Sequence, residues 1–356
     1  MEFIETAPSV SSIETLEAIL NVKDIRAVIS NKSKYYIEFD VKGRKVNSVK
    51  EPLLSIHKKI RSFFLKKVNY PDFLFGGILN KDYLSNSKKH LNKNIILSED
   101  IKNFYPSISQ GLVKKIYQHF FKNPPDVAKV LAELCCINGS VVTGSSISSD
   151  IANLVFYDVE TEMVCSFESQ GLNYTRYIDD ITISTDRRLT SPEIKEIKEK
   201  VYAMLTAKGF GINRKKSKLM SRDRRMAVHG VIVNNKDLNV SSEKKSNLRA
   251  ALHHLELRIK NKESLSGIVK NIRSIKGRID SLKRSGYKGN ADRKLQDIVR
   301  LIDEQTVKKY IRKIRRVDTK KGYQRMLGNI SVFKNYSSKI NAIIKSEKKN
   351  IREKIF

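Results

Sequence analysis

The apolar positions of the chain follow two patterns, which change near residues 235–239. Before this boundary, short runs of β-type composition, such as residues 34–41, alternate with segments of helical spacing, such as residues 53–65. Beyond it, apolar residues recur every three or four positions in two stripes: Leu248, Leu252, Leu255 and Ile259, then Leu265, Ile268, Ile272, Ile275, Ile279 and Leu282. The first pattern predicts a mixed body of strands and helices, and the second predicts a bundle of amphipathic helices.

The basic residues are concentrated in the helical part. The 356 residues include 69 Lys and Arg against 38 Asp and Glu, which gives a formal net charge of +31. Residues 241–356 hold 32 basic and 11 acidic residues, so this last third of the chain carries two thirds of the excess. Because Lys and Arg bind nucleic acid by releasing its condensed counterions, we expect the paired helices to follow a nucleic-acid backbone. For residues 345–354, a solvated chain end is an equally good interpretation.

Length and composition exclude several classes of protein. The 40% of hydrophobic residues suffices for a buried core and excludes global disorder, and 356 residues allow two or three structural units. The sequence contains no apolar run of about 18 residues and no signal-peptide pattern, so we expect a cytoplasmic protein without a membrane partner. The three cysteines, two of which are the neighbours Cys135 and Cys136, fit neither a disulfide framework nor a zinc site.

Acidic residues stand at the ends of two strand-like segments. Residues 175–184 place Asp179 and Asp180 between β-branched runs, which is typical of a hairpin tip, although an exposed turn has a similar composition. A second apolar run, residues 95–99, leads into Asp100, and carboxylates from both segments can meet on one sheet. Such a set would hold two divalent ions about 4 Å apart for phosphoryl transfer. Mg²⁺ is expected, because it binds carboxylates together with substrate phosphates.

These segments resemble motifs of the bacterial reverse transcriptases. Tyr177-Ile-Asp-Asp180 resembles the family's Tyr-x-Asp-Asp box, and the segment that begins at Asp100 resembles its first catalytic strand. The resemblance implies that Asp100, Asp179 and Asp180 are catalytic and bind metal, with the Ile101 carbonyl as a further ligand. The cofactors that it implies are two Mg²⁺ ions, with Mn²⁺ as an alternative.

The same resemblance implies nucleotide contacts. Tyr105 matches the aromatic gate that lies under the sugar, and a core aromatic is the alternative interpretation. Residues 135–154 are similar to the loop and helix that hold template and nucleotide, which implicates Thr143 and Gly144, although the prolines of the family's turn are absent. The residues expected to contact the triphosphate from the fingers are Arg44, Lys45 and Lys81.

Residues 209–217 resemble the family's lysine motif, in which a lysine protonates the pyrophosphate leaving group. Lys216 aligns best with that lysine, and Lys215 and Lys218 are alternatives. Taken alone, a run of lysines on a loop is more often plain surface.

Two short elements are similar to those of retron reverse transcriptases. Asn86-Ser-Lys-Lys-His90 stands where those enzymes carry Asn-Ala-x-x-His, and Val228-His-Gly230 stands where they carry Val-Thr-Gly. The residues that this resemblance implicates in RNA or primer binding are Asn86, His90, Val228, His229 and Gly230. A lone histidine usually orients a turn, and this physical role is expected for His90.

The resemblance covers residues 30–285 and implies an RNA-directed DNA polymerase of a retron-like element. Such enzymes copy a structured noncoding RNA into DNA from an internal 2′-hydroxyl. The expected partners are this RNA, the DNA product, deoxynucleoside triphosphates and, in antiphage defence, a toxin or effector protein. The departures from the family's motifs leave two alternatives: a defence-associated reverse transcriptase of a non-retron subgroup with different priming, and a noncatalytic RNA-binding scaffold.

The fold class that follows is α+β. The resemblance implies a right-hand polymerase, with fingers and palm built from an antiparallel sheet and helices, and an all-helical basic thumb. The expected divisions are an N-terminal helical segment at residues 1–30, fingers and palm at 31–235, the thumb at 236–290 and a basic helical extension at 291–356.

Overall fold

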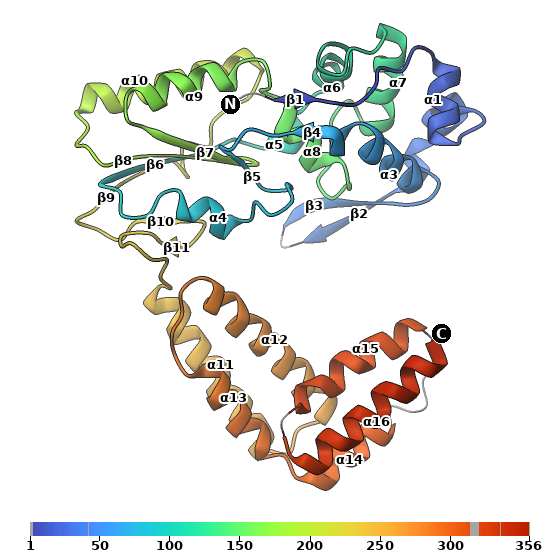
Figure 1. The fold of residues 1–356 in the computed structure, drawn as a ribbon, viewed down its shortest axis with the longest axis vertical. Coiled ribbons are helices and arrows are strands. Elements are labelled where there is room, and N and C mark those ends of the chain that lie inside the picture. Colours follow the sequence, from blue (N-terminus) through green and yellow to red (C-terminus); the bar gives the residue numbers. More distant parts are fainter. Residues whose placement is uncertain (1–2, 42, 314–319, 335, 356) are drawn as a thin grey trace. The chain divides into compact units, whose positions relative to one another are not determined.

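The computed structural model describes residues 3–41, 43–313, 320–334 and 336–355. The chain divides into two compact units. The first unit contains residues 1–229 and 233–236, and the second contains residues 230–232 and 237–356. Strands and helices mix in the first unit, whereas the described part of the second consists mainly of helices (Figure 1). The prediction of an α+β fold with a helical C-terminal region is confirmed.

The first unit is organised around a five-stranded sheet in the order β5-β7-β8-β6-β9. The strands are β5 (Leu74–Phe75), β6 (Ile95–Asp100), β7 (Asn173–Tyr177), β8 (Asp180–Thr185) and β9 (Lys218–Ser221). Four of them pair antiparallel, as expected, but β5 lies parallel to β7, so the sheet is mixed. A two-residue strand is too short to leave an alternating pattern in the sequence, which explains why β5 was not predicted.

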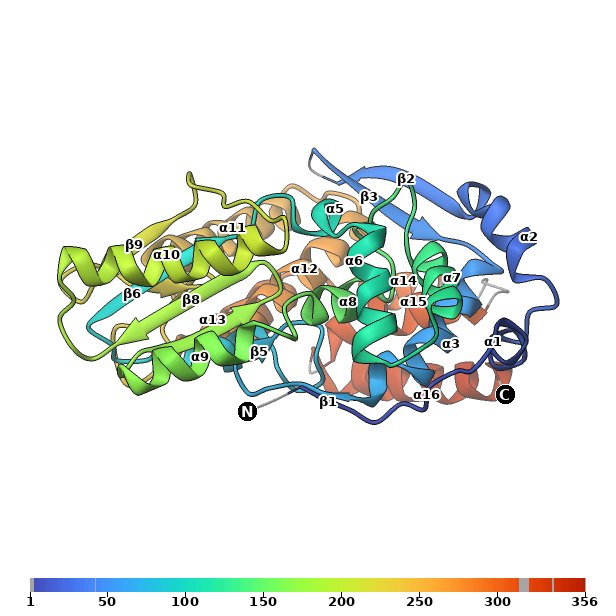
Figure 2. The ribbon, with the colours of Figure 1, turned by 90° about the horizontal axis from the view of Figure 1, so that it is seen from above.

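One face of the sheet is covered by α9 (Glu160–Ser169) and α10 (Ser191–Ala207), as Figures 1 and 2 show. α10 begins with a capping box, in which Thr190 and Glu193 satisfy each other's backbone N–H groups. The apolar side of this helix is buried at Ile197, Val201, Met204 and Leu205. The opposite face is partly covered by α4 (Tyr83–Lys88), and the site described below lies at the end of β6 and the start of β8.

Many of the other elements of the first unit lie to one side of the sheet (Figures 1 and 2). Its helices are α1 (Ile13–Leu20), α2 (Ile25–Ser30), α3 (Leu53–Phe63), α4 (Tyr83–Lys88), α5 (Phe104–Ser107), α6 (Gln110–Lys115), α7 (Pro125–Cys135) and α8 (Ser148–Leu154). The remaining strands are β1 (Ile4–Glu5), β4 (Val68–Asn69), the hairpin β2 (Tyr36–Val41) and β3 (Arg44–Val49), and β10 (Ala227–Val228). Cys135 and Cys136 are fully buried in the hydrophobic core, as reduced core residues would be.

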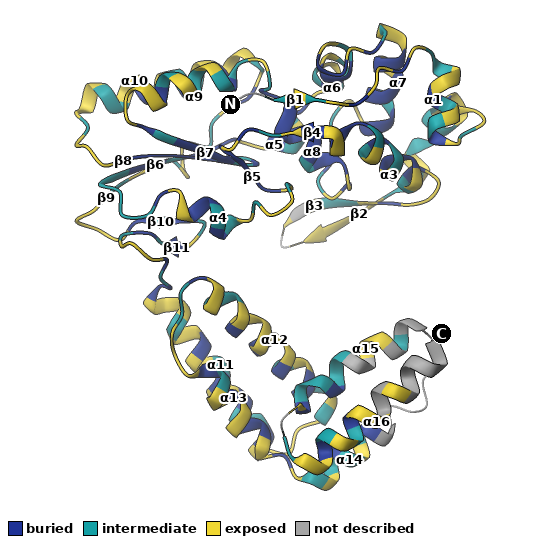
Figure 3. Cartoon of the chain, viewed as in Figure 1, coloured by how far each residue is buried: buried dark blue, intermediate teal, exposed yellow. Residues whose placement is uncertain are grey.

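In its described residues, the second unit contains β11 (Val231–Ile232) and six amphipathic α-helices. They are α11 (Ser242–Lys260), α12 (Leu265–Arg284), α13 (Ala291–Arg300), α14 (Glu304–Lys313), α15 (Lys320–Ile330) and α16 (Ser338–Ile355). The predicted stripes form one side of a single buried cluster that continues to Ile344. Figure 3 shows buried and exposed residues alternating along these helices. Among the residues that the structure describes, no helix is long and apolar enough to cross a membrane.

A buried ion pair connects the helices of the first unit to β7. Neither Arg176 on β7 nor Glu160 at the start of α9 exposes any of its side chain, and the Arg176 Nε and Nη2 groups donate to the two Glu160 oxygens over 2.6 and 2.7 Å. The other Arg176 hydrogen bonds run to the backbone carbonyls of Ala152, Asn153 and Ile178. All five N–H groups of the guanidinium therefore have a partner.

Replacing one member of this pair should destabilise the fold strongly. In Glu160→Gln, the amide NH₂ would meet an Arg176 N–H donor, and the buried positive charge would lose its counterion. We expect the free energy of unfolding, measured in urea, to fall by about 3 kcal/mol. As a control, Glu199→Gln removes an exposed helical pair with Lys195 and should change it by less than about 0.5 kcal/mol. Equal effects in the two variants would contradict the importance of the buried pair.

Candidate active site

The β7–β8 hairpin carries two of the predicted acids on a tight turn. Tyr177 pairs with Asp180, so Ile178 and Asp179 are the only residues of the turn. Ile178 has a φ of +56°, a conformation that costs a β-branched residue about 1–3 kcal/mol. Gly76 lies against this turn, and a Cβ on Gly76 would come within 2.9 Å of the Ile178 side chain.

Hydrogen bonds on both sides hold the strained turn. The Ile178 carbonyl accepts from Arg176 Nη1 at 3.1 Å, and the Ile178 N–H donates to the Phe75 carbonyl at 3.3 Å. The Asp179 carbonyl accepts from the Ile101 N–H at 2.9 Å. The turn is thus fixed to β5 and to the end of β6, and the direction of the Asp179 side chain is set by the fold.

Three carboxylates converge at this end of the sheet. Asp100 and Asp180 are directly opposed residues of β6 and β8, so their side chains share one face. Burial raises the pKa of Asp179 to about 6, and the nearby charges of Asp180 and Asp100 add to this rise. The three acids named from the sequence are therefore brought together, and their mutual repulsion makes the site suited to a cation.

A lysine contacts the acidic group. Lys216 Nζ donates to Asp100 Oδ2 at 2.8 Å, and this bond raises the pKa of Lys216. The contact separates Lys216 from the alternatives Lys215 and Lys218, because it is Lys216 that reaches the carboxylates. The side chain is still about half exposed, so it remains accessible from solvent.

The nucleotide-binding candidates lie on several elements. Tyr105 on α5 is partly buried, and its hydroxyl lies 3.2 Å from Ser149 Oγ on α8. Thr143 accepts a backbone hydrogen bond from Asn47 on β3 at 2.8 Å. Gly144 has a φ of +103°, and a Cβ there would lie 2.6 Å from the Asn47 carbonyl. Gly144 therefore permits a close backbone approach to β3 of its own chain.

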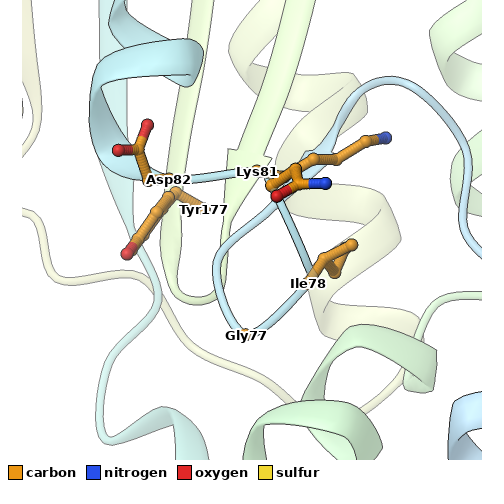
Figure 4. A pocket seen from close by; sticks show the side chains of 6 residues that line it. Gly77, Ile78, Lys81, Asp82 and Tyr177 are labelled. Carbon is orange, nitrogen blue, oxygen red and sulfur yellow. The ribbon is translucent and has the colours of Figure 1, made fainter.

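The basic candidates of this region are engaged in different ways. Arg44 begins β3, but its side chain lies outside the described part of the structure. Lys45 is exposed and pairs with Glu38 at 2.9 Å. Lys81 Nζ donates to the Pro71 carbonyl at 2.9 Å. Lys81 and Tyr177 line a pocket of about 440 Å³, and Figure 4 shows the Lys81 side chain extending away from Tyr177.

Asn86 and His90, which the resemblance implicates in RNA or primer binding, lie inside the protein. Neither side chain is exposed at all, so neither can touch RNA in this structure. The His90 ring nitrogens lie 2.7 Å from the hydroxyls of Ser184 and Thr175, and Thr175 donates to Asn86 Oδ1 at 3.2 Å. Burial lowers the pKa of His90 to about 3, so the ring is neutral. Both residues support β7 and β8 from within.

The Val228-His-Gly230 segment is placed in part beside the acids. His229 Nδ1 lies 3.6 Å from Asp180 Oδ2, and its ring centroid is 4.7 Å from that of Tyr177. Val228 is buried, and its carbonyl accepts from Ser87 Oγ at 3.1 Å. Gly230, in the second unit, accepts from Lys244 Nζ at 2.6 Å.

The sequence analysis missed the residues that hold the turn. Arg176 and Glu160 were not singled out, although an arginine in the middle of a predicted strand of the sheet is a signal of a buried partner. The partner could not be identified from the sequence, because 16 residues separate the two and many acids lie nearby.

Comparisons with known proteins agree with these features. The family model "Reverse transcriptase (RNA-dependent DNA polymerase)" matches residues 30–236. The chain is 36% identical over 216 residues to the retron Se72 reverse transcriptase of Salmonella heidelberg. The matched region covers 58% of this chain and 57% of that protein. It is 27% identical over 264 residues to the retron Ec48 reverse transcriptase of Escherichia coli. This match covers 68% of this chain and 64% of that protein. The chain therefore spans less than two thirds of the length of either relative.

Among solved structures, apo telomerase from Candida tropicalis matches with a TM-score of 0.45 and 11% identity, over 99% of this chain and 74% of that one. This similarity is too weak to support an argument about fold. The family model, in contrast, covers more than half of the 356 residues, so the chain belongs to the reverse transcriptase (RNA-dependent DNA polymerase) family.

Proposed function

We propose that this protein is an RNA-directed DNA polymerase of a retron-like element. The observation that carries the proposal is the convergence of Asp100, Asp179 and Asp180 at one end of the sheet, with Lys216 Nζ bound to Asp100. In the proposed reaction, a primer hydroxyl attacks the α-phosphate of a deoxynucleotide, and pyrophosphate leaves. In this proposal, Lys216 would donate a proton to the departing pyrophosphate.

The reverse transcriptase family implies divalent metal ions, and the donor set fits them chemically. No three His, Cys, Asp or Glu side chains within the described ranges are grouped closely enough to enclose an ion by themselves. Mg²⁺ needs fewer protein ligands, since it binds through one or two carboxylates together with water and substrate phosphates. Asp100, Asp179 and Asp180, with the Ile101 carbonyl, would hold two Mg²⁺ or Mn²⁺ ions. When bound, the ions would stabilise negative charge on the reacting phosphate.

The proposed roles of the other candidates follow from their positions. Tyr105 would lie under the sugar of the incoming nucleotide, with its hydroxyl held by Ser149. Thr143, Gly144 and the β2–β3 hairpin form one connected surface, which would support the template and nucleotide together with Lys45 and Arg44. His229 would act at the primer side of the site, next to Asp180.

The two units suggest a division into fingers, palm and thumb. We assign residues 31–235 to fingers and palm, 236–290 to a thumb and 291–356 to a basic extension. The exposed faces of α11 to α13 carry many Lys and Arg side chains, such as Lys270, Lys276 and Arg278. Such a surface would bind the phosphates of an RNA–DNA duplex without regard to sequence.

The retron subtype is supported by the similarity to two retron reverse transcriptases and by the two short elements around Asn86 and Val228. We propose a structured noncoding RNA as template, priming from an internal 2′-hydroxyl, a role in antiphage defence with a toxin or effector partner, and a cytoplasmic location. A non-retron defence enzyme with different priming is the alternative. A noncatalytic scaffold is disfavoured, because all three acids are retained.

The repulsion among the acids should be measurable without any reaction. Asp179 has a pKa of about 6 in the folded protein and about 3.9 when unfolded, so folding disfavours its charged form. At pH 7 and with a chelator present, Asp179→Asn should therefore raise the free energy of unfolding by about 1–3 kcal/mol. This gain should shrink as the pH falls through 6 and vanish only below about pH 3, where Asp179 is protonated in both states.

When Mg²⁺ is added, the wild type should have a larger free energy of unfolding than Asp179→Asn, because the ion stabilises the wild type more than the variant. Urea unfolding monitored at each pH, with and without Mg²⁺, provides the measurement. A stability difference that grows on acidification, or that Mg²⁺ leaves unchanged, would show that the acids do not form a cation site.

Replacing Asp179 and Asp180 should abolish deoxynucleotide incorporation without weakening the binding of RNA. In the double variant Asp179→Asn and Asp180→Asn, we expect incorporation of deoxynucleotides to fall by at least about 1,000-fold, since several kcal/mol of charge stabilisation is lost. Binding to the copurifying RNA, measured by filter retention, should stay within about twofold, because phosphate contacts elsewhere dominate affinity. Asp126→Asn, on an exposed turn of α7, is the matched control. Synthesis retained in the double variant would refute the polymerase assignment.

The product distinguishes the subtype from its alternative. We expect sequencing of the nucleic acid that copurifies with the active protein to recover a branched RNA–DNA molecule, because priming from an internal 2′-hydroxyl leaves the DNA joined to the RNA. Digestion with ribonuclease should then leave a ribonucleotide stub on the 5′ end of the DNA. Unbranched, repetitive DNA would instead support a non-retron subgroup.

A further inference from the structure

The loop that carries Lys216 leaves the sheet and returns to it within a few residues. An isolated bridge joins Ile101 to Ile212, and β9 begins its pairing with β6 at Ser98 and Lys218. Two residues of β6, Glu99 and Asp100, therefore face the five residues 213–217. The loop of residues 213–217 is fixed to the sheet at both ends. The direction of its side chains therefore depends on the contacts of its central residues.

The two β6 acids hold the loop from opposite faces of the sheet. Successive side chains of a strand point to opposite faces, so Glu99 and Asp100 point away from each other. Asp100 Oδ2 accepts from Lys216 Nζ at 2.8 Å, and Glu99 Oε1 accepts from Ser217 Oγ, also at 2.8 Å. Adjacent residues of the loop are thus held by adjacent residues of the strand.

Glu99 has no part in the proposed chemistry, yet it is a costly residue to bury. Only 2% of its surface is exposed, and Oε2 has no hydrogen-bond partner among the described residues. Two residues of α10 also interact with this carboxylate. Lys198 Nζ lies 3.3 Å from Oε1 and donates to Ser217 Oγ at 3.1 Å, and Tyr202 interacts with both Glu99 and Ser217. The helix on the far face of the sheet is therefore linked to the loop through this carboxylate.

We propose that Glu99 and Ser217 are positioning residues that direct Lys216 to the reacting phosphates. The Lys216 side chain is long and half exposed, so without a fixed backbone it would sample many rotamers. Its neighbour Ser217, held on the buried face, fixes the backbone at the position from which Nζ reaches Asp100. This inference rests on the proposed role of Lys216 as the proton donor to pyrophosphate.

The test measures single-nucleotide incorporation under single-turnover conditions, over a range of nucleotide concentrations. Ser217→Ala should lower the maximal rate constant about tenfold and leave the half-saturating nucleotide concentration within about twofold, because the loop misplaces a group that acts in the chemical step. Lys216→Ala should lower that rate constant about 100-fold. Ser217→Thr keeps the hydroxyl, and Glu99→Gln keeps an acceptor oxygen. Each of these single variants should retain most of the wild-type rate constant.

A double-mutant cycle then identifies the route of the effect. If Ser217 acts through Lys216, adding Ser217→Ala to Lys216→Ala should cause no further loss. Ser169→Ala, which removes an exposed serine that donates to the Ser166 carbonyl, should leave the rate constant unchanged and controls for the loss of a hydroxyl. Urea midpoints of all variants show whether any loss follows from unfolding.

The outcomes separate the two proposals. An unchanged rate in Lys216→Ala would refute the role of Lys216 in the proposed function. A slow Lys216→Ala with a fully active Ser217→Ala, or a full tenfold further loss in the double variant, would refute the positioning role and leave the proposed function intact.

Discussion

The buried pair of Arg176 and Glu160 is the interaction on which the site depends. A buried charge pair is tolerated only where its hydrogen bonds are complete, and here every guanidinium N–H has a partner. Glu160 also occupies the first residue of α9, where the helix dipole favours a negative charge. Because Arg176 binds the Ile178 carbonyl, the same network stabilises a turn that isoleucine would not adopt alone. The position of Asp179 is therefore set in part by a buried hydrogen-bond network on the opposite face of the sheet.

The acidic and basic side chains of β6, β7 and β8 have different tasks on the two faces of the sheet. On the α9 and α10 side, Glu99 and Arg176 are fully or almost fully buried and serve to hold the backbone. On the other side, Asp100 and Asp180 are opposed at the strand ends, where their repulsion is only partly offset by Lys216. Successive side chains of a strand point to opposite faces. Glu99 and Asp100, which are neighbours on β6, can therefore serve different tasks in a regular strand. Charge can thus be concentrated at one end of the sheet while buried groups on the opposite face, such as the Arg176–Glu160 pair, hold the backbone.

The parts of the fold that the sequence predicts are those with local causes. The stripe from Leu248 to Ile259 appears as the buried side of α11, because helical periodicity needs only nearby residues. Asp179 and Asp180 were located from the hairpin pattern, and Asp100 from the end of an apolar run. The parallel strand β5, the burial of His90 and the partners of Gly144 depend on contacts between distant segments. No spacing in the sequence encodes those contacts, so they could be found only in three dimensions.

The net charge of +31 acquires a physical meaning once it is divided between the units. The helices of the second unit bury their apolar stripes in a common cluster, so their many Lys and Arg side chains remain on the outside. The first unit, by comparison, gathers three acids whose repulsion raises the pKa of one of them. Both arrangements are unfavourable for the isolated protein, since like charges are brought together in each. A polyanion with its accompanying cations would relieve both at once, which is why the binding of nucleic acid and the chemistry of the carboxylates are expected to be linked.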